Sequence, residues 1–206
     1  MKICVFASGT GTNFKAIIDS IKKGYLRSKI NLLISNNPNC NAVKIAASHG
    51  INFEIISNQL YKTIPQKELA RIFLKILKKH KSDFIVLAGF MKFIPVEVVN
   101  KFRNKIINIH PALLPLFGGK GMFGINVHRA VIKSGVKVSG ITIHFVNEIY
   151  DEGRIIFQKC CNVTSNDDEF TLQKKIQKLE HKYYPDIIKK FEDRKIKVRE
   201  DKVWVS

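Results

Sequence analysis

Short apolar runs alternate with amphipathic stretches through the first half of the chain. The apolar runs have the length and β-branched content of strands, and five strands are expected, at residues 3–7, 31–35, 52–56, 84–88 and 106–109. Between them, apolar residues recur at helical spacing, which predicts helices at residues 14–23, 41–49 and 66–81. Strands that alternate with helices indicate βαβ units and a mostly parallel sheet.

The second half of the chain follows a different pattern. Strand-like runs at residues 138–146 and 155–163 are separated by too few residues for a crossover helix, so this pair is expected to be antiparallel. A long helix is expected at 169–191, and the tail at 196–205 is typical of a β-hairpin that turns near Glu200 and Asp201. The prediction is a single α/β domain over residues 1–206, Rossmann-like, with helices on both faces of a twisted, mostly parallel sheet.

Length and composition narrow the class of protein. The chain has 206 residues, of which 45% are hydrophobic, and this is enough to bury a full core. No apolar run reaches the ~18 residues that a membrane-spanning helix needs. The N-terminus enters a strand directly, without the features of a signal peptide, and the four cysteines have no CxxC spacing. We therefore expect a cytoplasmic protein with reduced cysteines and no membrane partner.

The net charge is unusual. Thirty-five Lys and Arg against 17 Asp and Glu give +18 at pH 7. Such a charge raises the possibility of nucleic-acid binding, but the lysines are spread through almost every segment and form no single stripe. We interpret the charge as compositional, consider a nucleic-acid partner unlikely, and expect the surface to favour small molecules that carry phosphate.

A glycine-containing loop follows the first predicted strand. Ser8, Gly9, Thr10 and Gly11 lead to Thr12 and Asn13 at the start of a helix. Glycine lets the backbone approach a ligand, and a helix N-terminus offers free N–H groups to an anion. Phe14 occupies the place of the third glycine of a dinucleotide-binding motif, so a single phosphate monoester is the better ligand. A simple strand-to-helix turn is the alternative.

Two polar residues share one face of the strand at 106–109 and its end. Asn108 and His110 are two positions apart, at the carboxyl end where ligands bind in open α/β sheets. An Asn amide can donate to a developing oxyanion, and a His can hold or move a proton near neutral pH. Asp151, in a later loop, is either a surface turn residue or a carboxylate near His110, where it would raise the pKa of the imidazole. No group of histidines has metal-ligand spacing.

Several segments taken in order resemble the folate-dependent formyltransferases, and in particular the phosphoribosylglycinamide formyltransferases of purine synthesis. The similarity runs from Lys2 to about Trp204. The segments that carry it are 8–13 (SGTGTN), 87–92 (LAGFMK), 108–115 (NIHPALLP), 144–146 (HFV), 151–153 (DEG), Glu180-His181 and Tyr184-Pro185.

The resemblance implies a role for each candidate residue. Asn108, His110 and Asp151 would be catalytic. Gly11, Thr12, Asn13 and Glu180 would bind the ribonucleotide substrate, the first three through its phosphate. The folate would be held by Asn108 and by two further segments, one comprising Met91, Lys92, Phe93 and Ile94 and the other Asn147, Glu148, Ile149, Tyr150 and Asp151. The co-substrate would be 10-formyltetrahydrofolate, with no metal, and the protein a monomer or a weak homodimer.

The chemistry of the residues suits this reaction. Asn108 and a protonated His110 would stabilise the oxyanion formed when the glycinamide amine attacks the formyl carbon. Asp151 would keep His110 charged and pass protons through a water.

Two places depart from the family. Gln66 and Lys67 stand where the family often has a folate-contacting Arg, and either could replace it. The glycine-rich loop at 118–124 is expected to be mobile over the site, with a plain surface excursion as the alternative.

Two rival functions remain open. A related formyltransferase acting on a sugar-nucleotide amine would need a substrate site different from one monophosphate loop and Glu180. A basic nucleic-acid-binding α/β protein would account for the charge but not for Asn108, His110 and Asp151. Enzymes of this family with an additional domain, such as those acting on methionyl-tRNA, are not expected at 206 residues.

Overall fold

The computed structural model describes residues 1–200 and 202–206. The chain divides into two compact units, Met1–Ile107 and Asn108–Ser206. The boundary falls inside the strand β5 (Ile106–His110), so the strand that carries Asn108 and His110 opens the second unit.

The sheet has the predicted mixed character. Seven strands are hydrogen-bonded in the order β3-β2-β1-β4-β5-β6-β7. In the first unit, β1 (Lys2–Phe6) pairs in parallel with both β2 (Lys29–Ser35) and β4 (Phe84–Leu87), and β2 pairs in parallel with β3 (Phe53–Ile55). All four residues of β4 are buried, as expected of a strand covered on both faces. The predicted α/β class is confirmed.

The helices of the first unit begin and end close to the predicted positions. The predicted ones are α1 (Thr12–Lys22), α2 (Asn41–Ser48) and α4 (Gln66–Lys79). Gly24 and Gly50, just beyond α1 and α2, have φ of 73° and 63°, which supports the prediction that glycines end these helices. Pro65 lies at the N-cap of α4, where a residue without an N–H costs no helical hydrogen bond.

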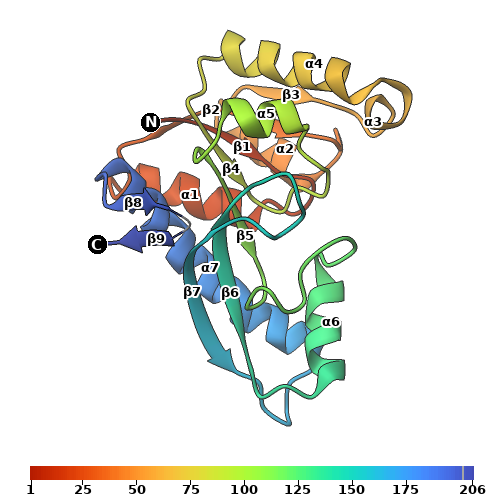
Figure 1. The fold of residues 1–206 in the computed structure, drawn as a ribbon, viewed down its shortest axis with the longest axis vertical. Helices are drawn as coiled ribbons and strands as arrows, with labels where there is room; N and C mark the ends of the chain where they lie inside the picture. Colours follow the sequence, from red (N-terminus) through yellow and green to blue (C-terminus); the bar gives the residue numbers. More distant parts are fainter. Residues whose placement is uncertain (201) are drawn as a thin grey trace. The chain divides into compact units, whose positions relative to one another are not determined.

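The second unit is built on an antiparallel pair. β6 (Val138–Phe145) pairs with β7 (Ile155–Asn162) in the predicted orientation. The long helix α7 (Glu169–Glu192) packs against both strands and against α6 (Ile125–Ser134), as Figure 1 shows. Asp168 begins α7 with a capping box, in which its carboxylate accepts from the Thr171 N–H and the Thr171 hydroxyl accepts from the Asp168 N–H.

The C-terminal tail forms the expected hairpin. β8 (Ile196–Arg199) pairs in antiparallel fashion with β9 (Lys202–Val205). The turn was predicted near Glu200 and Asp201, and Asp201 lies outside the described residues. Over residues 1–200 and 202–206, no helix is both long enough and apolar enough to cross a bilayer.

Three helices were not predicted. They are α3 (Leu60–Thr63), α5 (Val96–Lys101) and α6. The first two span four and six residues, too few for a helical period to emerge from the pattern of apolar positions. α6 follows the glycine-rich segment at 117–124, and the loop-like composition of that segment obscures the helical spacing of Val127 and Val131, which α6 buries.

Candidate active site

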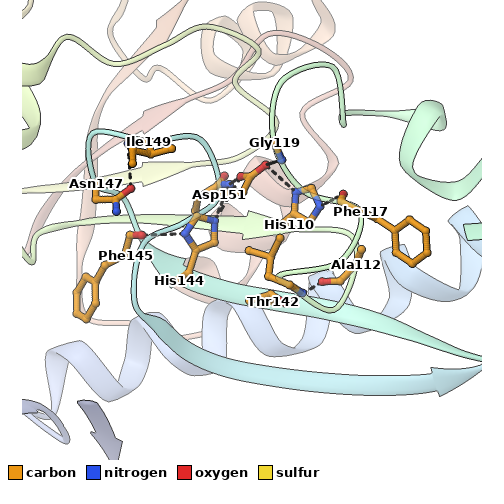
Figure 2. Close-up of polar contacts among 12 residues, drawn as sticks. His110, Ala112, Phe117, Gly119, Thr142, His144, Phe145, Asn147, Ile149 and Asp151 are labelled. Atoms are coloured by element: carbon orange, nitrogen blue, oxygen red, sulfur yellow. Dashed lines mark hydrogen bonds and ion pairs between the residues drawn. The ribbon is translucent and has the colours of Figure 1, made fainter. Parts of the chain in front are cut away.

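A cluster of polar side chains lies on the adjacent strands β5 and β6 of the second unit. His110 projects from β5 and His144 from β6 (Figure 2). Asn108, two positions before His110, hydrogen-bonds to His144 and Asp151 and so lies on the same face of β5, as its spacing predicts. Asp151 reaches the same cluster from the loop after β6. The three residues predicted to be catalytic are therefore together, with His144 as a fourth member.

Asp151 lies between the two imidazoles. Its Oδ2 is 3.6 Å from Nδ1 of His110, and its Oδ1 is 3.6 Å from Nε2 of His144. Oδ2 also accepts a hydrogen bond of 2.9 Å from the Gly119 N–H. Asp151 has a φ of 58°, in the left-handed region that Asp tolerates better than most residues. The carboxylate is thus held by its backbone and by three neighbours in one position.

His110 is buried and has an acceptor near each ring nitrogen. Its Nε2 lies 2.8 Å from the carbonyl oxygen of Phe117, to which the ring N–H donates. Phe117 has a φ of 57°, so the segment that contacts both His110 and Asp151 follows an uncommon backbone path. Residues 117 and 119 thereby tie the glycine-rich loop to the cluster. The predicted mobility of that loop stays a prediction.

The pKa of His110 is set by opposing effects. Burial lowers it and is the largest influence, while Asp151 and the Phe117 carbonyl raise it and His144 lowers it. The net direction is downward, so the expectation that Asp151 keeps His110 charged is only half right. Asp151 acts in the predicted direction, but the loss of hydration around a ring that is 2% exposed is larger.

The carboxyl of Asp151 responds in the other direction. Burial raises its pKa, but the neighbouring His144 and His110 and the hydrogen bond from the Gly119 N–H together outweigh burial, and the pKa is lowered. Asp151 is therefore a carboxylate at neutral pH, adjacent to an imidazole that burial drives toward the neutral form.

Asn108 is oriented by His144. Its Nδ2 lies 3.1 Å from Nε2 of His144 and 3.4 Å from Oδ1 of Asp151. Nδ1 of His144 lies 2.8 Å from the Phe145 carbonyl, so this nitrogen carries the proton and Nε2 can accept from the amide. No chemical role was assigned to His144 from the sequence. The signal available was its place in an alternating strand, two positions from Thr142.

Thr142 holds the segment that follows His110. Its hydroxyl donates to the Ala112 carbonyl (2.7 Å, Figure 2). The same hydroxyl accepts from the Leu114 N–H (3.0 Å), and Gln158 donates to the Leu114 carbonyl. This segment leads from β5 to Phe117 and Gly119. Thr142 was not predicted from the sequence, because its role depends on β6 lying beside the segment that follows β5.

The loop at 147–151 presents its apolar side chains to solvent. Asn147 accepts from the Ile149 N–H through its own side chain (3.1 Å), which shapes the turn before Asp151. Ile149 is 55% exposed and Tyr150 is 42% exposed. Exposed apolar side chains next to a buried polar cluster suit contact with an aromatic ligand, as predicted for Asn147, Glu148, Ile149 and Tyr150.

In the first unit, hydrogen bonds to its backbone carbonyls fix the glycine loop. The carbonyls of Gly9, Thr10 and Gly11 accept from Ala42 N, Asn41 Nδ2 and Lys15 N respectively. Gly11 is the N-cap of α1, with φ 72°, and a Cβ there would lie 2.9 Å from Ala42 Cα. Thr12 and Asn13 follow in the first turn of α1, and their role in binding a phosphate stays a prediction.

The segment after β4 contains the other predicted folate residues. Met91 is 45% exposed and Ile94 is 3% exposed. The Met91 N–H donates to the Ser8 hydroxyl (2.9 Å), and Nζ of Lys92 lies 5.7 Å from the ring centroid of Tyr61. Phe93 lies between, half-buried. Gln66 and Lys67 are exposed in the first turn of α4.

Glu180 is buried on α7, one turn before the fully buried Tyr184. Burial raises the pKa of the Tyr184 hydroxyl well above its usual range, and the Glu180 charge adds to this. A buried carboxylate on a helix is uncommon unless it has polar partners or a function. Glu180 belongs to the same unit as Asn108, His110 and Asp151, whereas residues 11–13 and 91–94 belong to the first unit.

Within residues 1–200 and 202–206, no group of three or more His, Cys, Asp or Glu side chains has the arrangement of a metal site.

Comparison with known proteins assigns the family. The model of the family described as formyl transferase matches residues 1–188. The chain belongs to the formyl transferase family. The resemblance inferred from the sequence is confirmed, and the chain is an enzyme of a family that uses 10-formyltetrahydrofolate.

Individual formyl transferases support a finer placement. The chloroplastic phosphoribosylglycinamide formyltransferase of Arabidopsis thaliana is 43% identical over 203 residues, covering 98% of this chain and 69% of that protein. The phosphoribosylglycinamide formyltransferase of Bacillus subtilis (strain 168) is 37% identical over 188 residues, covering 91% of this chain and 93% of that protein. The structure of glycinamide ribonucleotide transformylase 1 from Symbiobacterium toebii has a TM-score of 0.91 at 29% identity, covering 100% of this chain and 93% of that one.

Proposed function

We propose that this formyl transferase moves a formyl group from 10-formyltetrahydrofolate to the amine of glycinamide ribonucleotide, a step of de novo purine (IMP) biosynthesis. The observation that carries the proposal is the cluster in which Asp151 lies 3.6 Å from His110 and 3.4 Å from the Asn108 amide. The names of the relatives at 37 to 43% identity point to the same substrate.

The folate supplies the formyl carbon. The residues of the cluster would stabilise the oxyanion that forms when the amine adds to this carbon. When an amine adds to that carbon, the formyl oxygen becomes an oxyanion. The donors that would face this oxygen are the Asn108 Nδ2 and, once it is protonated, the His110 Nδ1, because the Nε2–H of His110 is bound to the Phe117 carbonyl. His144, by accepting from Asn108, would hold the amide in the orientation that presents a donor.

His110 would change its protonation during the reaction. Burial lowers its pKa and favours the neutral ring before the reaction. An oxyanion adjacent to the ring would raise the pKa again, because an opposite charge favours the imidazolium. Asp151, whose pKa is lowered, would accept the proton released by the attacking amine, directly or through a water, and return it to N10 of the folate, so that the C–N10 bond breaks and tetrahydrofolate leaves. The proton that His110 takes up would come from water and return to water when the oxyanion collapses.

The remaining predicted residues would bind the two substrates. Gly11, Thr12 and Asn13 would hold the ribonucleotide phosphate through the N–H groups of the first turn of α1. Glu180, a buried carboxylate, would accept from hydroxyl or amine groups of the same substrate. Residues 91–94, 108 and 147–151 would bind the folate. Correct placement of amine and formyl group would supply much of the rate enhancement.

The test is formyl transfer to glycinamide ribonucleotide, followed by folate absorbance. Wild-type protein is expected to turn over, and His110→Ala to lose at least about a hundredfold in kcat. His49→Ala is the matched control, because this imidazole hydrogen-bonds only within the end of α2. Absence of turnover in folded wild-type protein, with turnover on a sugar-nucleotide amine, would replace the proposal by the rival formyltransferase.

Location and assembly belong to the proposal as well. We expect a cytoplasmic enzyme that is a monomer or a weak homodimer. Light scattering over a range of protein concentrations would measure the mass of the species, and a tight higher oligomer would contradict this expectation.

A further inference from the structure

A chain of hydrogen bonds crosses the carboxyl ends of four strands in the first unit. It begins at Met91, just after β4, and passes through Ser8 after β1 and Asn36 after β2 to Asn58 after β3. These four residues are called here the edge relay. None of them was assigned a role in catalysis or binding except Met91, which belongs to the predicted folate segment.

Ser8 is the branch point of the edge relay. It is 7% exposed, and its hydroxyl accepts from the Met91 N–H (2.9 Å) and donates to Oδ1 of Asn36. Its own backbone N–H donates to the Gly89 carbonyl (3.0 Å). Ser8 therefore hydrogen-bonds to the residues on both sides of Phe90, between the end of β4 and the predicted folate segment.

The polarity of the edge relay is fully determined. The Met91 N–H can only donate, so the single hydroxyl proton of Ser8 is available for Asn36 Oδ1. With Oδ1 engaged in this way, the Asn36 amide turns its Nδ2 toward Oδ1 of Asn58, at 2.8 Å. Asn36 is 7% exposed, so each of these bonds satisfies a group that would otherwise be costly to bury.

The edge relay also reaches the glycine loop. Ser8 is three residues before Gly11, and the loop between them is held by bonds from Ala42 N to the Gly9 carbonyl (3.1 Å) and from Asn41 Nδ2 to the Thr10 carbonyl (2.8 Å). One buried hydroxyl therefore links Met91 to a loop that further hydrogen bonds hold in place.

We propose that Ser8 and Asn36 are positioning residues that set the glycine loop and the Met91 segment in one shared geometry, so that binding at the phosphate subsite and binding at the folate subsite favour each other. This inference rests on the proposed function for what the two subsites bind. Such coupling is reciprocal, since each ligand stabilises the arrangement that the other one needs.

The first experiment tests the edge relay without any ligand. Ser8→Ala removes the acceptor of the Met91 N–H, and amide hydrogen exchange at Met91 is expected to become at least about tenfold faster, the size expected for one lost hydrogen bond. The Ala88 amide, which donates to Phe6 in the strand ladder, is expected to keep its protection. Unchanged exchange at Met91 would overturn the proposal.

Ser35→Ala is the matched control variant. Ser35 is a fully buried serine at the end of β2, and its hydroxyl bonds only within the turn that follows, to Asn37 and Cys40. Its removal deletes the same group from the same edge of the sheet without touching Met91. Asn36→Asp is a second variant, which keeps an acceptor for Ser8 but loses the donor to Asn58, and serves if Ser8→Ala does not fold.

The second experiment measures the coupling. The affinity for a non-reactive folate analogue is determined by calorimetry with and without saturating glycinamide ribonucleotide. We expect wild type and Ser35→Ala to show about fivefold or greater enhancement, and Ser8→Ala to lose it. KM for both substrates should rise in Ser8→Ala while kcat stays within about threefold, because no reacting group is touched.

The outcomes separate the two proposals. If wild-type protein neither binds nor formylates glycinamide ribonucleotide, the proposed function fails and the coupling fails with it, whatever the exchange data show. If wild type is active but Ser8→Ala has the coupling and KM values of Ser35→Ala, the edge relay is only structural and this inference is overturned while the proposed function stands.

Discussion

Nδ1 of His110 lies 3.6 Å from Oδ2 of Asp151, and the other oxygen of the same carboxylate lies at the same distance from His144. One carboxylate thus faces two buried imidazoles. Because burial lowers the pKa of His110 and the cluster lowers that of Asp151, the pair holds a neutral base beside an anion before any substrate is bound.

Removal of the Asp151 charge is expected to abolish catalysis without abolishing binding. Asp151→Asn keeps the shape of the side chain but loses the proton acceptor, so kcat should fall by about a hundredfold or more. Ribonucleotide affinity, measured by calorimetry, should persist, since Asp151 is not in the predicted phosphate subsite. Asp193→Asn, at the end of α7, is the charge-matched control. Near-normal turnover of Asp151→Asn would refute the assigned role.

Simple anions should compete with the ribonucleotide for the glycine loop. If the N–H groups at Thr12 and Asn13 hold a phosphate, inorganic phosphate or sulfate will raise KM for the ribonucleotide and leave kcat unchanged. Chloride at matched ionic strength controls for general screening of the +18 charge. Equal inhibition by chloride and phosphate would count against a phosphate subsite at this loop.

Gly118 is expected to tolerate no side chain. A Cβ at this position would lie 2.5 Å from Leu114 Cδ2 and 3.2 Å from Asp151 Cβ. Gly118→Ala should therefore displace Asp151 and lower kcat by about tenfold or more, since catalytic groups must be held within about 0.5 Å.

The Leu114 contact offers an internal control for Gly118→Ala. Leu114→Val removes the Cδ2 atom that the new methyl would meet, so the double variant should recover part of the activity. Strictly multiplicative effects of the two substitutions would show that the clash with Leu114 is not the cause of the loss.

His128 should make stability depend on pH. Burial, and then the charge of His110, lower the pKa of His128 to about 4 from 6.5. Below pH 6.5 the His128 imidazole takes up a proton in the unfolded chain but stays neutral in the folded protein. The free energy of unfolding therefore falls as pH falls from 6.5 toward 4. Between pH 6.5 and 5 this group alone contributes about 2 kcal/mol.

Urea denaturation at pH 7 and pH 5 measures the contribution of His128. In His128→Gln the difference in unfolding free energy between the two pH values should shrink, whereas in His49→Gln it should match wild type. An unchanged difference in His128→Gln would contradict the assignment of this acid sensitivity to His128.

Much of the fold could be predicted because the relevant information is local. β1, α1, β2 and α2 follow one another as the periodicity indicates, and glycines end both helices as expected. α5 and α6 were missed because the first is too short to display a period and the second begins in a glycine-rich segment. The antiparallel pairing of β6 with β7 followed from the shortness of their connection, which is also a local property.

Some residues of the candidate site could also be predicted from local sequence, and others could not. Alternation along a strand places Asn108 and His110 on one face, and this required only the residues themselves. His144, Thr142 and the backbone of Phe117 and Gly119 entered the site only through pairing and packing between segments distant in the chain. The edge relay through Ser8 and Asn36 likewise joins residues that are 28 and 83 positions apart.

By itself, the sequence determined the α/β class, the order of most elements, the family and the chemical identity of the candidate residues, because periodicity, turn residues and motifs are read along the chain. The tertiary structure alone decided the balance of effects in the cluster. Whether His110 is charged depends on how burial compares with one carboxylate 3.6 Å away, and both quantities exist only once the segments around β5 and β6 have packed together.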